Sequence, residues 1–222
     1  MTVDINQVLE DLDLTQEWVD FFVQESNRLE PQPGTEPGSA LYQQHREALI
    51  YALVMSHQDR YALPNEVHRL LLRGRPQAGE IRVSHIRDRR VDVYLNPNRI
   101  PFFMWRWNMD TRQRIEAVRE VDISEDEREN TVWNLHCELV NIHPYELYNG
   151  RVGRIMMVNH ALLADLSPWV VTLDSRSEYL TILKDHPSSG WALKYDEEDD
   201  LHWSTVRDRP RHDANLPGHK FD

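Results

Sequence analysis

Apolar residues recur at intervals of three and four positions along most of the chain, and this period predicts a mainly helical protein. Thr15 and Ser124 each precede an apolar-periodic segment, so we expect their hydroxyl groups to cap the helices that follow. Residues 155–166 are apolar on nearly every side, which is typical of a central buried helix. The predicted helices cover residues 4–12, 15–29, 41–56, 64–74, 101–119, 124–142, 150–167 and 175–184.

Residues 79–95 depart from the helical period. Residues 81–83 and 91–95 alternate apolar and polar side chains around a charged turn, which predicts a β-hairpin. From Arg69 to Arg90 the chain carries seven arginines against two acidic residues. Two interpretations stay open for this basic stretch: a rim that attracts phosphate groups or an acidic target, and a solvated surface turn.

The composition is that of a globular protein: of 222 residues, 40% are hydrophobic and 28% are charged, enough for one domain with an ordinary core. The formal net charge of −12 disfavours nonspecific binding to nucleic acid or to an anionic membrane. No apolar run is long enough to cross a bilayer, and the N-terminus lacks the features of a signal peptide. A single cysteine excludes an intramolecular disulfide, so we expect a cytoplasmic protein.

The stretch with the clearest chemistry is HPYELYNGRVGR, residues 143–154, between two predicted core helices. His143 ends the first helix, and Asn149 and Gly150 tolerate the left-handed backbone of a tight turn. The second helix opens at about Gly150, with Arg151 and Arg154 on one face of its first turn. A helix N-terminus with two guanidinium groups favours a phosphate, and a histidine beside it is able to take a proton from a hydroxyl group.

This stretch resembles the Fic family motif, His-Pro-Phe-x-Asp/Glu-Gly-Asn-Gly-Arg-x-x-Arg. Tyr145 stands in place of Phe, Leu147 in place of the acidic residue and Tyr148 in place of the first Gly. Residues Gly79, Glu80 and Arg82 also resemble the Gly-Glu-x-Arg stretch that leads into a hairpin flap in that family. The motif positions that match are His143, Pro144, Asn149, Gly150, Arg151 and Arg154.

The resemblance implies an all-α fold: a Fic-type helical domain at residues 40–185 with a small β-hairpin flap over the active site. An N-terminal helical segment at 1–30 would precede it, and an irregular tail at 186–222 would follow it. The flap residues expected to hold a protein target in extended form are Val91, Asp92, Val93 and Tyr94.

The activity implied by the resemblance is that of a protein adenylyltransferase, with ATP as the substrate. His143 would deprotonate a Ser, Thr or Tyr hydroxyl group of a target protein, and the oxygen would attack the α-phosphorus. The phosphates would lie over Asn149, Gly150, Arg151 and Arg154. The expected partners are therefore a nucleotide and a protein target, and the sequence leaves the oligomeric state open.

Many Fic proteins carry a Ser/Thr-x-x-x-Glu-Gly/Asn motif whose glutamate contacts the second motif arginine and blocks productive ATP binding. Glu25-Ser26-Asn27 resembles a variant of it, with Phe21 in place of the Ser or Thr. Under that interpretation Glu25 pairs with Arg154 and autoinhibits the enzyme. The other interpretation, a solvent-exposed helical glutamate, stays open.

The family acid that holds Mg²⁺ is replaced by Leu147, which has no oxygen to donate to a hard cation, so no protein metal ligand is assigned. Two further hypotheses therefore stay open: a Fic-fold transferase with another phosphate-containing donor, and a catalytically silent nucleotide- or protein-binding module. His136, Cys137 and His143 form no tetrahedral zinc set, and Cys137 is expected to be a small buried hydrophobic residue.

Overall fold

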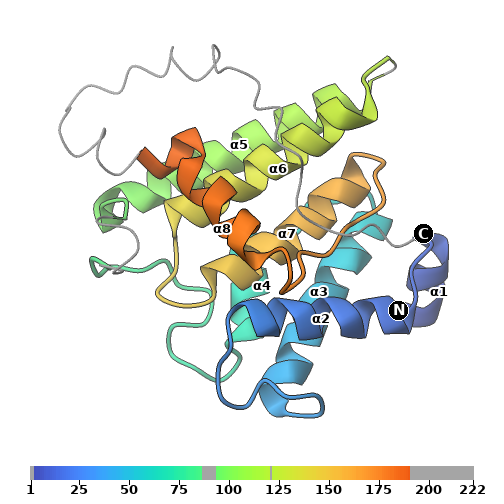
Figure 1. Cartoon of the computed structure of the whole chain (residues 1–222), viewed down its shortest axis with the longest axis horizontal. Helices are drawn as coiled ribbons and strands as arrows, with labels where there is room; N and C mark the ends of the chain where they lie inside the picture. Colours follow the sequence, from blue (N-terminus) through green and yellow to red (C-terminus); the bar gives the residue numbers. More distant parts are fainter. Residues whose placement is uncertain (1–2, 87–93, 121, 191–222) are drawn as a thin grey trace.

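The computed structural model describes residues 3–86, 94–120 and 122–190, and most of these residues lie in helices (Figure 1). The all-α fold class is thereby confirmed. The α-helices are α1 (Ile5–Asp11), α2 (Gln16–Leu29), α3 (Ala40–His57), α4 (Pro64–Leu71), α5 (Ile100–Val118), α6 (Glu125–Ile142), α7 (Asn149–Leu163) and α8 (Arg176–Asp185), with short 3₁₀ helices η1 (Pro97–Arg99) and η2 (Pro187–Gly190).

The hairpin flap stays a prediction. Val91, Asp92 and Val93 lie outside the described residues, and neither 80–86 nor 94–96, the described parts of this segment, forms a strand. Most of the expected tail, residues 191–222, also lies outside them.

Helix starts follow the sequence closely. The Thr15 hydroxyl accepts a hydrogen bond from the backbone N–H of Trp18 at 3.1 Å, and the Ser124 hydroxyl accepts one from Glu127 at 3.3 Å. Both predicted caps are confirmed, because each side-chain oxygen satisfies a donor that has no partner within the first turn.

Helix α7 is the central element of the fold, as its apolar sequence predicts. It packs against α6 and α3, and also against α4 and α2 (Figure 1). Gly153 allows the close approach of α6, since a Cβ atom there would lie 2.6 Å from Val140 Cγ2. A side chain at this position would push the two helices apart.

Two hydrophobic clusters fix α7 from opposite sides. Val152 and Ile155 join a cluster with apolar residues of α2, α3, α4 and the start of α5. Met157 and Ala161 join a second cluster with residues of α6 and α8, and this cluster includes Cys137, which is buried as predicted. Because both faces of the helix are packed, its N-terminus is held in a defined place.

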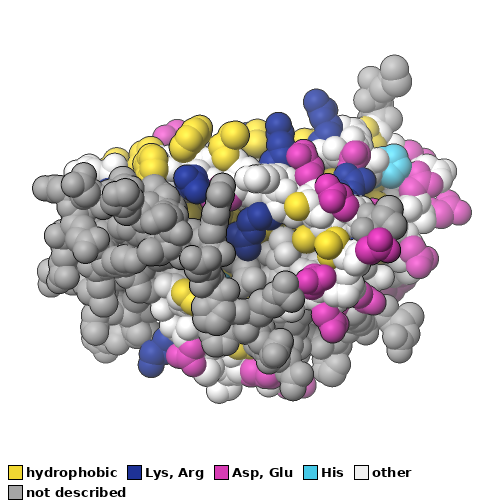
Figure 2. All heavy atoms as spheres, turned by 90° about the horizontal axis from the view of Figure 1, so that it is seen from above, with side chains coloured by type: hydrophobic (Ala, Val, Ile, Leu, Met, Phe, Trp, Pro, Cys, Tyr) yellow, Lys and Arg dark blue, Asp and Glu magenta, His cyan; other side chains and the backbone are white. Residues whose placement is uncertain are grey.

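Helix α5 carries an apolar stripe on its exposed side. Phe102, Trp105 and Met109 are 38%, 59% and 58% exposed, and their spacing places them on one side of the helix. Figure 2 shows hydrophobic side chains in a row along the upper edge of the molecule. Phe103 and Trp107 instead enter the core. Among the described residues, no helix has the length and apolar character needed to cross a membrane.

Candidate functional site

His143 lies directly after α6, as the sequence predicts, and ends this helix in a left-handed conformation with φ 51° and ψ 58°. Its backbone N–H donates to Leu139 O at 3.3 Å. The imidazole ring stacks on the ring of Tyr94, with the centroids 3.9 Å apart and the planes at 22°. Tyr94, the one of the four predicted flap residues that the structure describes, thus packs against the histidine that the motif predicts to be the general base.

The loop after His143 is braced by side chains inside it. Tyr145 is fully buried, stacks on His68 with centroids 4.0 Å apart, and donates its hydroxyl to Asn65 Oδ1 at 2.7 Å. Asn149 Oδ1 accepts from Tyr145 N at 2.9 Å, and Asn149 Nδ2 donates to Tyr145 O at 2.7 Å. Asn149 therefore shapes the loop; its expected contact with phosphate stays a prediction.

The tight turn is made by Tyr148 and not by the Asn149-Gly150 pair. Asn149 and Gly150 are the first two residues of α7, whereas Tyr148 adopts φ 66° and ψ 19°. The expectation that the Asn-Gly pair supplies the left-handed backbone is wrong. A left-handed tyrosine costs about 1–2 kcal/mol. The guanidinium carbon of Arg151 lies 4.3 Å from the Tyr148 ring centroid, and this cation–π contact offsets part of that cost.

Arg151 and Arg154 point to one place, the C-terminal end of α2. Arg151 Nη2 donates to the backbone carbonyl of Glu30 at 2.8 Å. Arg154 donates from Nε to Ser26 Oγ at 2.9 Å, from Nη2 to Ser26 O at 3.1 Å and from Nη1 to Glu30 Oε1 at 3.0 Å. Both arginines are only 1% exposed. Their donors are thus directed at oxygen atoms that carry negative or partial negative charge.

Glu30, and not Glu25, is the acid at this site. A Cβ atom at Gly150 would lie 1.9 Å from Glu30 Oε1, so the carboxylate occupies the N-terminus of α7, where a phosphate is expected. The predicted contact between Glu25 and Arg154 is wrong. Glu25 Oε2 instead accepts from the backbone N–H of Leu173 at 2.8 Å.

The sequence did contain a signal for Glu30. Ser26 and Glu30 have the Ser-x-x-x-Glu spacing of the family's inhibitory motif, with Pro31 in place of the Gly or Asn. One helical turn separates these two residues, so both reach Arg154 from the same side. Assigning Glu25 placed the acid five residues too early.

The positive charge of the site resides on the arginines. Burial lowers the pKa of Arg151. Burial also opposes the charge of Arg154, but Glu30 and Tyr179 outweigh it, and the pKa of Arg154 is raised. Burial, assisted by Arg151 and Arg154, holds the pKa of His45 well below its usual range. His45 is therefore neutral, and its Nδ1 lies 2.9 Å from Asn27 Oδ1.

Comparisons with known proteins place this geometry in a known fold. No family model and no curated protein matches the sequence. Among solved structures, a Fic domain containing signalling protein from Bacteroides thetaiotaomicron is similar, with a TM-score of 0.64 and 17% identity over 80% of this chain and 74% of that one. The chain has a Fic-like fold.

Within this Fic-like fold, the position of the family's metal-binding acid is apolar. Leu147 is 39% exposed, and the neighbouring carboxylate of Glu146 accepts a hydrogen bond from Ser84 Oγ at 2.7 Å. Among the residues that the structure describes, no three His, Cys, Asp or Glu side chains gather in a group able to hold a metal ion. The donor set around residue 147 does not fit a magnesium ion.

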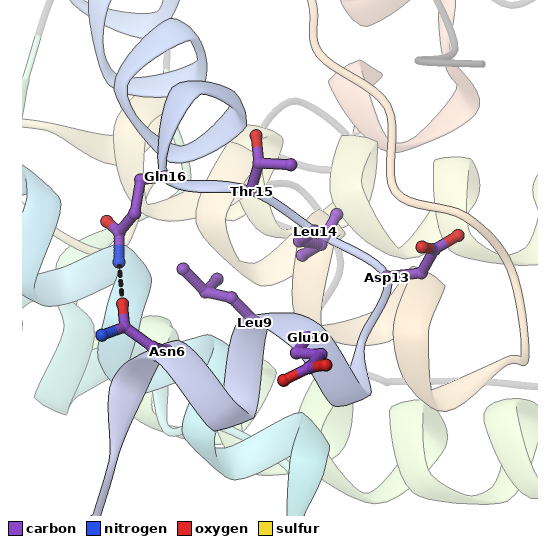
Figure 3. Close-up of a pocket in the computed structure, with 7 residues that line it drawn as sticks. All are labelled: Asn6, Leu9, Glu10, Asp13, Leu14, Thr15 and Gln16. Carbon is purple, nitrogen blue, oxygen red and sulfur yellow. Dashed lines mark hydrogen bonds between the residues drawn. The ribbon is translucent and has the colours of Figure 1, made fainter.

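A hollow of about 360 Å³ lies elsewhere on the Fic-like fold, between α1 and the start of α2 (Figure 3). Asn6 and Gln16 face each other across it and are joined by a hydrogen bond of 3.0 Å, and Thr15 beside them caps α2. None of the predicted site residues lines this hollow. Its side chains connect two helices, and we assign it no chemistry.

Proposed function

We propose that the protein is an adenylyltransferase that moves AMP from ATP to a Ser, Thr or Tyr hydroxyl group of a target protein. The observation that carries the proposal is the carboxylate of Glu30 at the N-terminus of α7, hydrogen-bonded to Arg154. An oxygen anion of the chain itself occupies the place where the motif predicts phosphate. The Fic-like fold and the position of His143 at the edge of the same loop support the same assignment.

In the proposed reaction, the phosphates of ATP replace the oxygens of Glu30 and Ser26 at the two arginines. The imidazole of His143 takes the proton from the target hydroxyl group, whose oxygen forms a bond to the α-phosphorus. The bond from that phosphorus to the bridging oxygen breaks, and pyrophosphate leaves. Arg151, Arg154 and the N-terminus of α7 would stabilise the charge that develops on the phosphates.

The same contacts support autoinhibition by Glu30. Two anions cannot share the N-terminus of α7, so ATP binds productively only after the carboxylate of Glu30 withdraws. Arg151 is also held by the Glu30 carbonyl, which adds a backbone oxygen to the obstruction. This role replaces the inhibitory role expected for Glu25.

A second candidate, a transferase with another phosphate-containing donor, is favoured by residues 147 and 148. Leu147 offers no oxygen, and Tyr148 fills with a buried ring the place where the family has glycine. Both changes alter the surroundings of the phosphates without removing the arginines or His143. A silent binding module remains the outcome if neither donor reacts.

The experiment that tests the proposal is transfer of label from α-labelled ATP to cell-lysate proteins. We would compare the wild type, Glu30→Gly, Glu25→Gly and His143→Ala, each with Mg²⁺, with Mn²⁺ and without metal. We expect the amount of label transferred by Glu30→Gly to be at least about tenfold above that of the wild type. Without the Glu30 carboxylate, most molecules would be in the state that binds ATP productively. His143→Ala in the Glu30→Gly background should lower the amount of label about 10²–10⁴-fold. Absence of label from all variants, with ATP binding intact by calorimetry, would favour the other donor or the binding module.

A further inference from the structure

Arg82 connects the predicted flap segment, residues 79–95, to the motif loop, residues 143–148. Its side chain donates to three backbone carbonyls: Nε to His143 O at 2.8 Å, Nη1 to Ser84 O at 2.7 Å and Nη2 to Leu95 O at 2.5 Å. Its own backbone N–H donates to Pro144 O at 2.9 Å. One residue thus joins both described ends of the flap segment to two successive peptide groups of the motif.

The guanidinium group of Arg82 is buried, with 3% of the residue exposed. Among the described residues Arg82 forms no salt bridge, and burial lowers its pKa although Tyr94 and Glu146 oppose this shift. Burying a cation is costly, and charge-assisted hydrogen bonds to carbonyl groups offset that cost. Apolar side chains would fill the same volume at lower cost, so packing alone does not account for an arginine here.

The carbonyl groups that Arg82 holds belong to residues that position the general base. His143 has a left-handed backbone, which a non-glycine residue keeps only when its surroundings enforce it. Its ring stacks on Tyr94, the residue before Leu95. By holding the carbonyls of His143 and Leu95 together, Arg82 fixes both backbones from which the stacked rings project.

We propose that Arg82 is a positioning residue for His143, and that it makes residues 80–86 and 94–96 unfold locally together with the motif loop, residues 143–148, in one joint opening. Lysine is the informative substitution, because it keeps the charge but has no planar fork able to reach three carbonyls at once. The part of this inference that concerns catalysis rests on the proposed function, whereas the joint opening does not.

Hydrogen exchange of the full chain tests the joint opening without any substrate. The reporters are the backbone amides of Arg82, which donates to Pro144 O, and of Tyr145, which donates to Asn149 Oδ1. In Arg82→Lys both should exchange at least about tenfold faster, while amides in the middle of α3 keep their rates. The matched control is Arg114→Lys. Arg114 is a half-buried arginine on α5 that forms an ion pair with Glu138 on α6.

Faster exchange at only one of the two reporters would overturn the proposal, as would an equal increase throughout the molecule. If Arg82→Lys does not fold, the wild type decides the question. Its Arg82 and Tyr145 amides should then show the same opening free energy and the same dependence on added urea. Different values for the two amides would refute the joint opening.

Kinetics test the positioning role once AMP transfer is established in the Glu30→Gly background. Arg82→Lys should lower kcat about 10²-fold while KM for ATP stays within about threefold, because the phosphates bind at α7 and not at the flap. An unchanged kcat, or a KM that rises in proportion to the loss of activity, would overturn it. If no AMP transfer occurs in any variant, the proposed function fails and the exchange result still decides the joint opening.

Discussion

The carboxylate of Glu30 lies so close to Gly150 that a Cβ atom at residue 150 would stand 1.9 Å from Glu30 Oε1. The ion pair between Glu30 and Arg154, 3.0 Å long, therefore depends on a glycine in the first turn of α7. The absence of a side chain at residue 150 thus leaves the space that the carboxylate of Glu30 occupies.

This relationship predicts that the cost of a methyl group at residue 150 depends on the side chain at residue 30. In the wild type, Gly150→Ala should destabilise the protein by about 1–3 kcal/mol, because the methyl group overlaps the carboxylate. In Glu30→Gly the contact with Arg154 Nη1, 2.9 Å from the Cβ position, remains, and the helix preference for alanine offsets part of its cost. Alanine should therefore cost clearly less in this background than in the wild type. Urea unfolding of the four proteins measures the coupling. Equal effects of Gly150→Ala in both backgrounds would mean that Glu30 does not occupy this place.

Glu25 is predicted to hold α2 in place without blocking the site. Its Oε2 accepts from Leu173 N, and Arg176 Nε nearby donates to Leu29 O at 3.1 Å. Glu25→Ala should cost about 1–3 kcal/mol in urea unfolding, since it leaves the Leu173 N–H unpaired. Arg28→Ala, which removes only the more exposed partner of Glu25, should cost less than about 1 kcal/mol.

The two glutamates should therefore differ in their effect on the reaction. Glu30→Gly should raise AMP transfer more than Glu25→Gly does, although both change the same end of α2. A larger rise with Glu25→Gly would contradict the assignment of Glu30 as the blocking residue.

Restoring an acid at residue 147 should create a dependence on metal. Leu147 is 39% exposed, so Leu147→Asp places a carboxylate at the surface at little cost in stability. In the Glu30→Gly background, we expect AMP transfer with Mg²⁺ to rise at least about tenfold over its value with chelator. Leu147→Asn is the control, because its amide has the same size without the charge. Equal activity of the two variants would argue against metal binding by the new carboxylate.

Stability should fall between pH 6.5 and about pH 4 because of buried histidines. Burial lowers the pKa of His160 to about 3 and that of His136 to about 4, from 6.5. Below pH 6.5 the unfolded chain binds protons that the folded chain does not, so the free energy of unfolding decreases as the pH falls. One pKa unit corresponds to about 1.4 kcal/mol, so each histidine contributes on the order of a few kcal/mol across this window.

The check is thermal unfolding of the wild type and His160→Leu from pH 7 to pH 4. Neither ring nitrogen of His160 has a hydrogen-bond partner among the described residues, so leucine loses no bond there. The Tm of His160→Leu should fall less steeply than that of the wild type. Parallel curves would show that His160 is not kept neutral by the fold. Carboxylates contribute equally to both proteins, so the difference isolates the histidine.

Features set by local rules were predictable from the sequence. Thr15 and Ser124 cap their helices because capping needs only the neighbouring turn, and the apolar run after Gly150 forms the central helix because no other environment suits it. Arg151 and Arg154 meet at one place since three residues span almost one turn. Such outcomes depend on periodicity and backbone chemistry alone.

Other features depend on contacts between distant segments, and the sequence did not reveal them. Arg82 was one of seven arginines in a stretch interpreted as a rim or a solvated turn, yet it is buried because carbonyls far along the chain satisfy it. Tyr148 adopts a left-handed backbone against its own preference, with Arg151 packed on its ring. Glu25 and Glu30 both fit a partial match to the inhibitory motif, and only the packing of α2 against α7 brings Glu30 to Arg154.

The short connection that follows Glu30 helps to keep its carboxylate close to Arg154. Residues 31–39 lead directly from Glu30 into α3, so the carboxylate is tethered beside Arg154 at both ends of its segment. A group held on so short a tether competes at an effective concentration in the millimolar range or above. Under the proposed function, a nucleotide would compete with this carboxylate, and the occupied fraction of the site would follow nucleotide concentration over the range where the two are balanced. Lengthening residues 31–39 would lower the effective concentration of the carboxylate. A lower nucleotide concentration would then be enough to displace it from Arg154.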